Sequence, residues 1–131
     1  MPGRKTHNAI ADAFKAGKPL IKRARNASTN RLGVMYEVKI DGDRVSACYW
    51  GTPVVTLDRA RNEITLRDGG YQTVTTKALM NAILWLYNAQ VWQTKGIWKI
   101  HRVGLWEVDF EDGMILKISP NYKDLIPVKA S

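Results

Sequence analysis

The sequence predicts one α+β domain in which antiparallel strands outnumber helices. Over most of residues 32–67 the apolar side chains fall two apart, as in a half-buried strand. Over residues 79–87 they fall three and four apart, as on one face of a helix. A chain of 131 residues suits a single domain with one ordinary core. We therefore expect strands on either side of one central helix that covers a sheet face.

The N-terminal part predicts a short helix followed by a loop. Residues 6–16 have a helical pattern with Thr6 as the N-cap, and Ile10 and Phe14 share one face. So short a helix must dock that face on the body or stay frayed. Residues 21–31 hold four basic side chains and few apolar ones, so we expect a loop that is mobile or becomes ordered on a ligand.

Two blocks of strands flank the central helix. Alternation and turn residues predict a four-strand antiparallel meander at residues 32–40, 44–50, 52–58 and 62–67. Four more short strands are expected at residues 90–94, 97–102, 105–110 and 114–118. By domain, we expect a basic arm with its short helix over residues 1–31, one α+β domain over 32–118, and a loosely packed tail over 119–131.

The junction before the central helix has clear local signals. Gly69 and Gly70 can adopt a positive φ without steric cost, and Thr75 or Thr76 can cap the first free N–H groups. Asn88 is a plausible cap at the other end.

The charge is concentrated at the N-terminus. Residues 1–31 carry eight Lys or Arg against one acid, which gives +7, and the other hundred residues carry twelve against eleven, which gives +1. The total is +8. Such an arm favours encounter with polyanions, although a merely solubilising role is the competing interpretation.

Several functional classes find no support in the sequence. No apolar run is long enough to span a membrane and no signal-peptide pattern is present, so we expect a cytoplasmic protein. Cys48 lies in an apolar strand pattern and is expected to be buried, and the spacing of His7 and His101 suggests no metal site. Hydrolase, phosphate-loop and zinc-protease motifs are missing, and no nucleophile or carboxylate is predicted near His101. We therefore expect no enzyme activity and no cofactor.

Nucleic-acid binding has more support. The basic arm offers phosphate contacts, and exposed aromatic rings can stack on bases. Trp92 and Tyr71 are the better candidates for exposure, whereas Trp85, Trp98 and Trp106 are expected in the core. The candidate binding residues are Lys18, Lys22, Arg23, Arg25, Arg31, Tyr71, Thr75, Thr76, Lys77, Asn81 and Trp92.

The start of the central helix is a second candidate. Free N–H groups, the hydroxyls of Thr75 and Thr76, and Lys77 form a potential anion site, which Asn81 would extend one turn further on. The structural alternative is that Thr75 only caps the helix and Lys77 is solvated.

The same stretch carries a family resemblance. Residues 66–81 (LRDGGYQTVTTKALMN) and 91–98 (VWQTKGIW), with the upstream AFKAG of residues 13–17, resemble small uncharacterised proteins of tailed bacteriophages. Those proteins share a Gly-aromatic-x-Thr-x-Thr-Thr-basic motif with a later Asn. Leu79 stands where an arginine is usual, which weakens a two-cation anion site. The resemblance implies a phage origin.

Three functional hypotheses follow from these observations. The leading one is a non-enzymatic phage accessory protein that binds nucleic acid through its basic arm and exposed aromatics. The first alternative is an inhibitor or adaptor that binds a host defence or transcription protein through a strand edge or an aromatic patch. The second alternative is a virion or assembly component. Edge strands also make a homodimer plausible.

Overall fold

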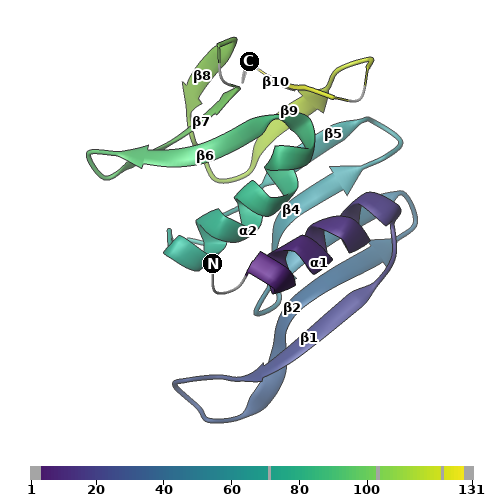
Figure 1. The fold of residues 1–131 in the computed structure, drawn as a ribbon, viewed down its shortest axis with the longest axis vertical. Helices are drawn as coiled ribbons and strands as arrows, with labels where there is room; N and C mark the ends of the chain where they lie inside the picture. Colours follow the sequence, from purple (N-terminus) through teal and green to yellow (C-terminus); the bar gives the residue numbers. More distant parts are fainter. Residues whose placement is uncertain (1–3, 71, 103, 122, 129–131) are drawn as a thin grey trace.

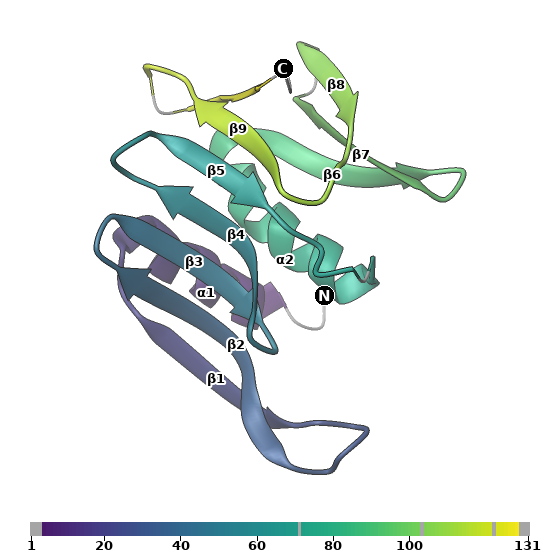
Figure 2. The same ribbon diagram turned by 180° about the vertical axis from the view of Figure 1, so that it is seen from behind.

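The part of the chain that the structure describes forms two sheets and two α-helices. The computed structural model describes residues 4–70, 72–102, 104–121 and 123–128. Helices α1 (Arg4–Ala16) and α2 (Val74–Leu84) lie on one face of a seven-stranded antiparallel sheet, with a three-stranded sheet beside α2 (Figures 1 and 2). A short 3-10 turn, η1 (Trp85–Tyr87), extends α2. This arrangement confirms the α+β prediction.

The ten strands of the described residues are divided between a large and a small sheet. The large sheet runs β1 (Leu20–Arg25), β2 (Leu32–Asp41), β3 (Arg44–Tyr49), β4 (Thr52–Asp58), β5 (Glu63–Leu66), β9 (Met114–Ile118) and β10 (Leu125–Pro127). The small sheet runs β6 (Ala89–Thr94), β7 (Ile97–Arg102) and β8 (Trp106–Asp109). The predicted meander is confirmed as β2 to β5. The sequence places β9 in the second block of strands, but in the structure it pairs with β5, with Leu116 opposite Ile64.

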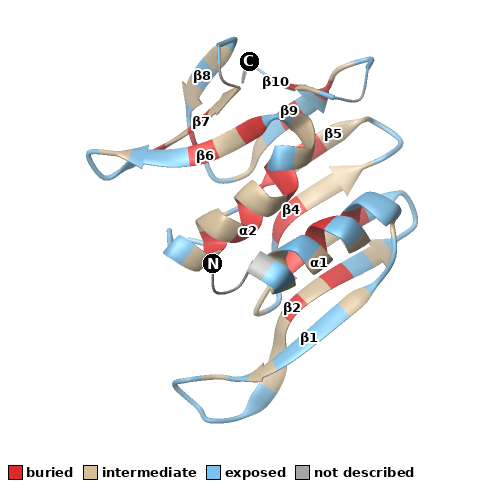
Figure 3. Cartoon of the chain, in the orientation of Figure 1, coloured by how far each residue is buried: buried red, intermediate tan, exposed pale blue. Residues whose placement is uncertain are grey.

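The core lies between the large sheet and the helices. Alternate residues of β3, β4 and β5 point to this side, and Val45, Val55 and Ile64 are fully buried. Ile10 and Phe14 of α1 are each 1% exposed, so the predicted docking face is confirmed. Figure 3 shows the buried residues of both helices on the sides that face the sheet.

Two segments that we expected to be irregular form strands. Residues 20–25 pair with β2, so the predicted loop over 21–31 is wrong for its first half. In the predicted loose tail, residues 125–127 pair with β9, and the Trp106 indole Nε1 donates to the Leu125 carbonyl at 2.9 Å. Both strands lie at an edge of the sheet. Backbone hydrogen bonds to one neighbouring strand stabilise them. They therefore lack the alternating apolar pattern by which an inner strand is recognised in the sequence.

The exposure of the tryptophan side chains agrees with the prediction for Trp98 but not for Trp85. Trp98 is 4% exposed and belongs to the core, as expected, but Trp85 is 59% exposed, so its predicted core position is wrong. The buried residues of α2 follow spacings of three and four and end at Ile83 and Leu84, so Trp85, the next residue, lies off this apolar face. Asn88 ends η1 in the left-handed conformation, which confirms the predicted cap.

Candidate nucleic-acid interface

The candidate interface is a basic hairpin, defined here as residues 18–36. It contains Lys18, β1, the turn to β2, and the first half of β2. Its basic residues are Lys18, Lys22, Arg23, Arg25 and Arg31, and it has no Asp or Glu, so its formal charge is +5. The turn of the hairpin lies at the lower edge of Figure 1, beyond the part of the sheet that the helices cover.

A bulge sets the direction of the hairpin. Lys22 lies opposite Tyr36, but the next residue, Arg23, lies opposite Val34, so the register shifts by one residue. A bulge of this kind increases the twist of the strands and turns their side chains to new directions. Arg23 and Arg25 are two apart on β1 beyond the bulge, so they share one face of the ribbon.

The turn of the hairpin is held by its own hydrogen bonds. The Asn26 carboxamide Oδ1 accepts from the backbone N–H groups of Ser28 and Thr29 at 2.8 and 3.2 Å. Arg25 Nη1 donates to the Asn30 carbonyl at 3.0 Å. This turn is the second half of the segment that we expected to be a mobile or ligand-ordered loop, and it adopts a hydrogen-bonded conformation.

The hairpin cations are accessible. The side chains of Lys18, Lys22, Arg23, Arg25 and Arg31 are all exposed. None of them takes part in the ion pairs found among the described residues, which join Lys99 to Asp109, Arg102 to Asp124, and Lys117 to Glu63. No carboxylate of the described residues therefore forms an ion pair with a cation of the hairpin.

Side chains of the chain itself cap the first turn of α2. Thr73, not Thr75 or Thr76, is the N-cap, so the predicted cap was wrong. The Thr73 hydroxyl accepts from the Thr76 N–H at 3.1 Å, and Thr76 is 3% exposed. Lys77 lies over the Trp98 ring, with Nζ 5.9 Å from its centroid and 3.5 Å from Gln93 Oε1. Of the predicted anion-site residues, Thr76 is thus bonded to the cap residue, Lys77 contacts the small sheet, and Thr75 is half-buried.

Asn81 has a structural contact that the sequence did not reveal. Its side-chain Nδ2 donates to the Val91 carbonyl at 2.9 Å, and its Oδ1 accepts from the Val91 N–H at 2.7 Å. We expected Asn81 to extend an anion site or to bond to a turn. Instead its carboxamide forms with Val91 of β6 the two backbone hydrogen bonds that a neighbouring strand would otherwise form.

Trp92 is exposed as predicted, but it lies far from the hairpin. It is 37% exposed on β6, its indole donates to Glu107 Oε1 at 2.8 Å, and its ring lies 5.8 Å from that of His101. Glu107 is directly opposite His101 on β8, a neighbouring carboxylate that we did not predict. Lys99 lies directly opposite Trp92 and pairs with Asp109, so Trp92 has charges of both signs around it. Tyr71 lies outside the described residues.

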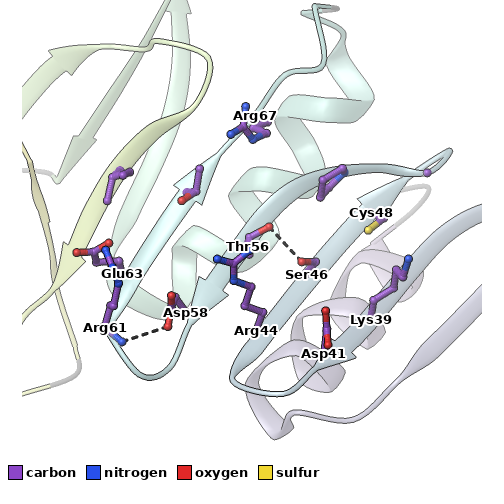
Figure 4. A pocket seen from close by; sticks show the side chains of 14 residues that line it. Lys39, Asp41, Arg44, Ser46, Cys48, Thr56, Asp58, Arg61, Glu63 and Arg67 are labelled. Atoms are coloured by element: carbon purple, nitrogen blue, oxygen red, sulfur yellow. Dashed lines mark hydrogen bonds between the residues drawn. The ribbon is translucent and has the colours of Figure 1, made fainter. Parts of the chain in front are cut away.

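A polar groove crosses the face of the large sheet that the helices leave open (Figure 4). Its volume is about 620 Å³. The charged lining residues are Lys39, Arg44, Arg61 and Arg67 against Asp41, Asp58 and Glu63, four positive and three negative. The Ser46 and Thr56 hydroxyls lie 3.1 Å apart in its middle. Because these charges nearly cancel, the groove attracts a polyanion less than the hairpin does.

Cys48 lines this groove but is only 4% exposed, which confirms its predicted burial. Burial, and then the Glu37 carboxylate, raise the pKa of the Cys48 thiol, with Lys39 opposing them. We therefore expect a thiol-reactive dye at pH 8 to modify the native protein at least about tenfold more slowly than the urea-unfolded protein. Equal labelling rates would contradict the burial.

The pKa of the Cys48 thiol is higher in the folded protein than in the unfolded one. The free energy of unfolding should therefore fall as pH rises above the unfolded thiol pKa of about 8.5.

Among the described residues, no three His, Cys, Asp or Glu side chains are grouped so that they could hold a metal ion. In the same part of the chain, no helix has the length and apolar character needed to cross a membrane.

Comparison with known protein families identifies the family of this chain. The model of a family described as Kyanoviridae Gp96 protein matches residues 4–117. The chain belongs to this phage family. The match runs from α1 into β9, so the basic hairpin lies within the family region. The phage origin implied by the sequence resemblance is thereby supported. Comparisons with curated proteins and with solved structures gave no significant match.

Proposed function

We propose that this phage protein is a non-enzymatic binder of double-stranded DNA, with the basic hairpin as its contact element. The observation that carries the proposal is the charge of the hairpin, +5 with no acid, on a projecting two-stranded ribbon. The major groove of B-form DNA is about 12 Å wide and admits such a ribbon. The major groove of double-stranded RNA is too deep and narrow for side-chain readout, which favours DNA.

The individual cations have different roles in this proposal. Arg25 holds the turn through its bond to the Asn30 carbonyl, so it contributes to the shape of the hairpin as well as to its charge. Lys22, Arg23 and Arg31 are exposed and make no ion pair with a described residue, so they contact phosphates. Because the turn is already hydrogen-bonded, binding costs less ordering entropy than for a flexible arm.

Other residues from the sequence prediction are left out of this interface. Trp92 lies on the small sheet, where its indole is bonded to Glu107, whereas the basic hairpin belongs to the large sheet. Lys77 is directed towards the same sheet by Gln93 and Trp98. The like charges of Lys22 and Arg23 also oppose pairing of two copies along the free edge of β1.

The test is a fluorescence-anisotropy titration of labelled duplex DNA, single-stranded DNA and duplex RNA at several salt concentrations. Binding of duplex DNA should weaken with salt, with a log–log slope of about −0.9 for each phosphate contact. The triple variant Lys22→Ala, Arg23→Ala, Arg31→Ala should reduce that slope by about 2 to 3 and weaken binding at least about tenfold at low salt.

A matched control separates the hairpin from net charge. The triple variant Lys5→Ala, Arg61→Ala, Lys95→Ala removes three exposed cations elsewhere and should leave affinity within about threefold of wild type. An equal loss in both variants would reduce the effect to net charge. Absence of duplex binding at low salt, or binding of single strands alone, would overturn the proposal.

A further inference from the structure

A second cavity lies at one end of the helix layer, and the proposed DNA contact does not use it. This end pocket has a volume of about 330 Å³. Its lining comes from the last turn of α1, the β4–β5 connection, η1 and the end of β9: Lys15, Leu57, Arg59, Asn62, Leu86, Tyr87 and Ile118. The volume falls within the range of ligand pockets, about 300–1,000 Å³.

The walls of the end pocket are mainly apolar. Leu57 and Ile118 belong to the sheet, and Leu86 and Tyr87 belong to η1. The pocket exists because α1 stops at Ala16 while α2 tightens into η1, so the helix layer ends before the sheet does. Burial raises the pKa of the Tyr87 phenol, in keeping with the apolar surroundings of its ring.

The rim of the pocket is positively charged. Lys15 and Arg59 are exposed, and the lining contains no Asp or Glu. Arg59 Nη2 donates to the Gly42 carbonyl at 3.4 Å, and a Cβ at Gly17 would lie 3.0 Å from Arg59 Nη1. The guanidinium group is therefore held between the end of α1 and the β2–β3 turn. Neither cation takes part in an ion pair among the described residues, so donors remain for a ligand.

We propose that the end pocket binds a small monocarboxylate with an aliphatic or aromatic body. The body lies between Leu57, Leu86 and Ile118, where it is removed from water. The carboxylate lies at the rim, where Arg59 donates charge-assisted hydrogen bonds and Lys15 adds its positive charge. The proposal is independent of DNA binding, because no residue of the basic hairpin lines the pocket.

The test uses octanoate as the probe, titrated into the isotope-labelled full chain and followed by the backbone amide NMR signals. Octanoate should shift the signals of Leu86, Tyr87 and Ile118 with saturation. Octanol, which lacks the charge, should bind about tenfold more weakly, and acetate, which lacks the body, should give no saturable shift. Shifts that map away from the pocket, or equal affinity for octanoate and octanol, would overturn the proposal.

Two variants and a control make the result specific. Arg59→Gln should weaken octanoate binding about tenfold, whereas Arg61→Gln, which removes a nearby cation that lines the groove on the open face instead, should leave it unchanged. Leu86→Phe should fill part of the pocket and abolish saturable binding while the amide spectrum stays folded. Wild-type affinity in Arg59→Gln, or retained binding in a folded Leu86→Phe protein, would contradict the assignment.

Discussion

The substitution Phe14→Ala is expected to lower the free energy of unfolding by about 3–5 kcal/mol. The Phe14 ring is 1% exposed and packs in the core shared by α1, α2 and the large sheet. Removing the ring takes away its transfer free energy and leaves a cavity that the sheet cannot close. Among the α1 residues whose burial is described, Ile10 and Ala11 are the ones buried with it, so the loss also weakens the docking of the helix. Urea denaturation followed by circular dichroism measures the change.

Asp12→Ala is the matched control for Phe14→Ala. Asp12 is exposed on the same helix, so its replacement should change stability by no more than about 0.5 kcal/mol. Phe14→Leu should fall between the two because it retains part of the buried volume. A loss below about 1 kcal/mol for Phe14→Ala would mean that α1 is not docked as described.

The second large effect is expected for Asn81→Leu, which should destabilise the protein by about 2–4 kcal/mol. The carboxamide bonds to both backbone groups of Val91, at 2.7 and 2.9 Å, from a half-buried position. Leucine has a similar size but leaves the Val91 N–H and C=O without these partners. Each unsatisfied group costs about 1–3 kcal/mol, which is why the effect exceeds that of a single lost hydrogen bond.

The control for Asn81→Leu is Asn8→Leu, the same change at an exposed position of α1, with an expected effect within about 0.5 kcal/mol. Hydrogen exchange adds a local readout, since the Val91 amide should lose protection selectively in the Asn81 variant. Unchanged stability together with unchanged Val91 protection would show that the contact between α2 and β6 is not formed.

Patterns within a few residues predicted much of the fold. The meander from β2 to β5 follows from apolar side chains two apart, and α2 follows from spacings of three and four. The docking of α1 could be read from Ile10 and Phe14. These features are predictable because one buried face imposes a period on the sequence of each element.

The edge strands and the partition of strands between sheets escaped prediction. β1 has exposed side chains at most positions, and its stability comes from backbone bonds to β2, which leave no side-chain pattern. The pairing of β9 with β5 joins residues about fifty apart along the chain. No local signal distinguishes that partner from β8, because pairing between distant strands is decided by burial of the whole layer.

The candidate sites divide in the same way. The sequence by itself determined that the positive charge is concentrated before residue 32, because this depends only on residue type and position along the chain. The tertiary structure decided that five of these eight cations lie on a projecting hairpin while the others lie on α1, and that Trp92 lies on another sheet. It also brought Lys15, Arg59 and Ile118 around one pocket. Such groupings depend on how distant elements pack, and no spacing along the chain encodes that packing.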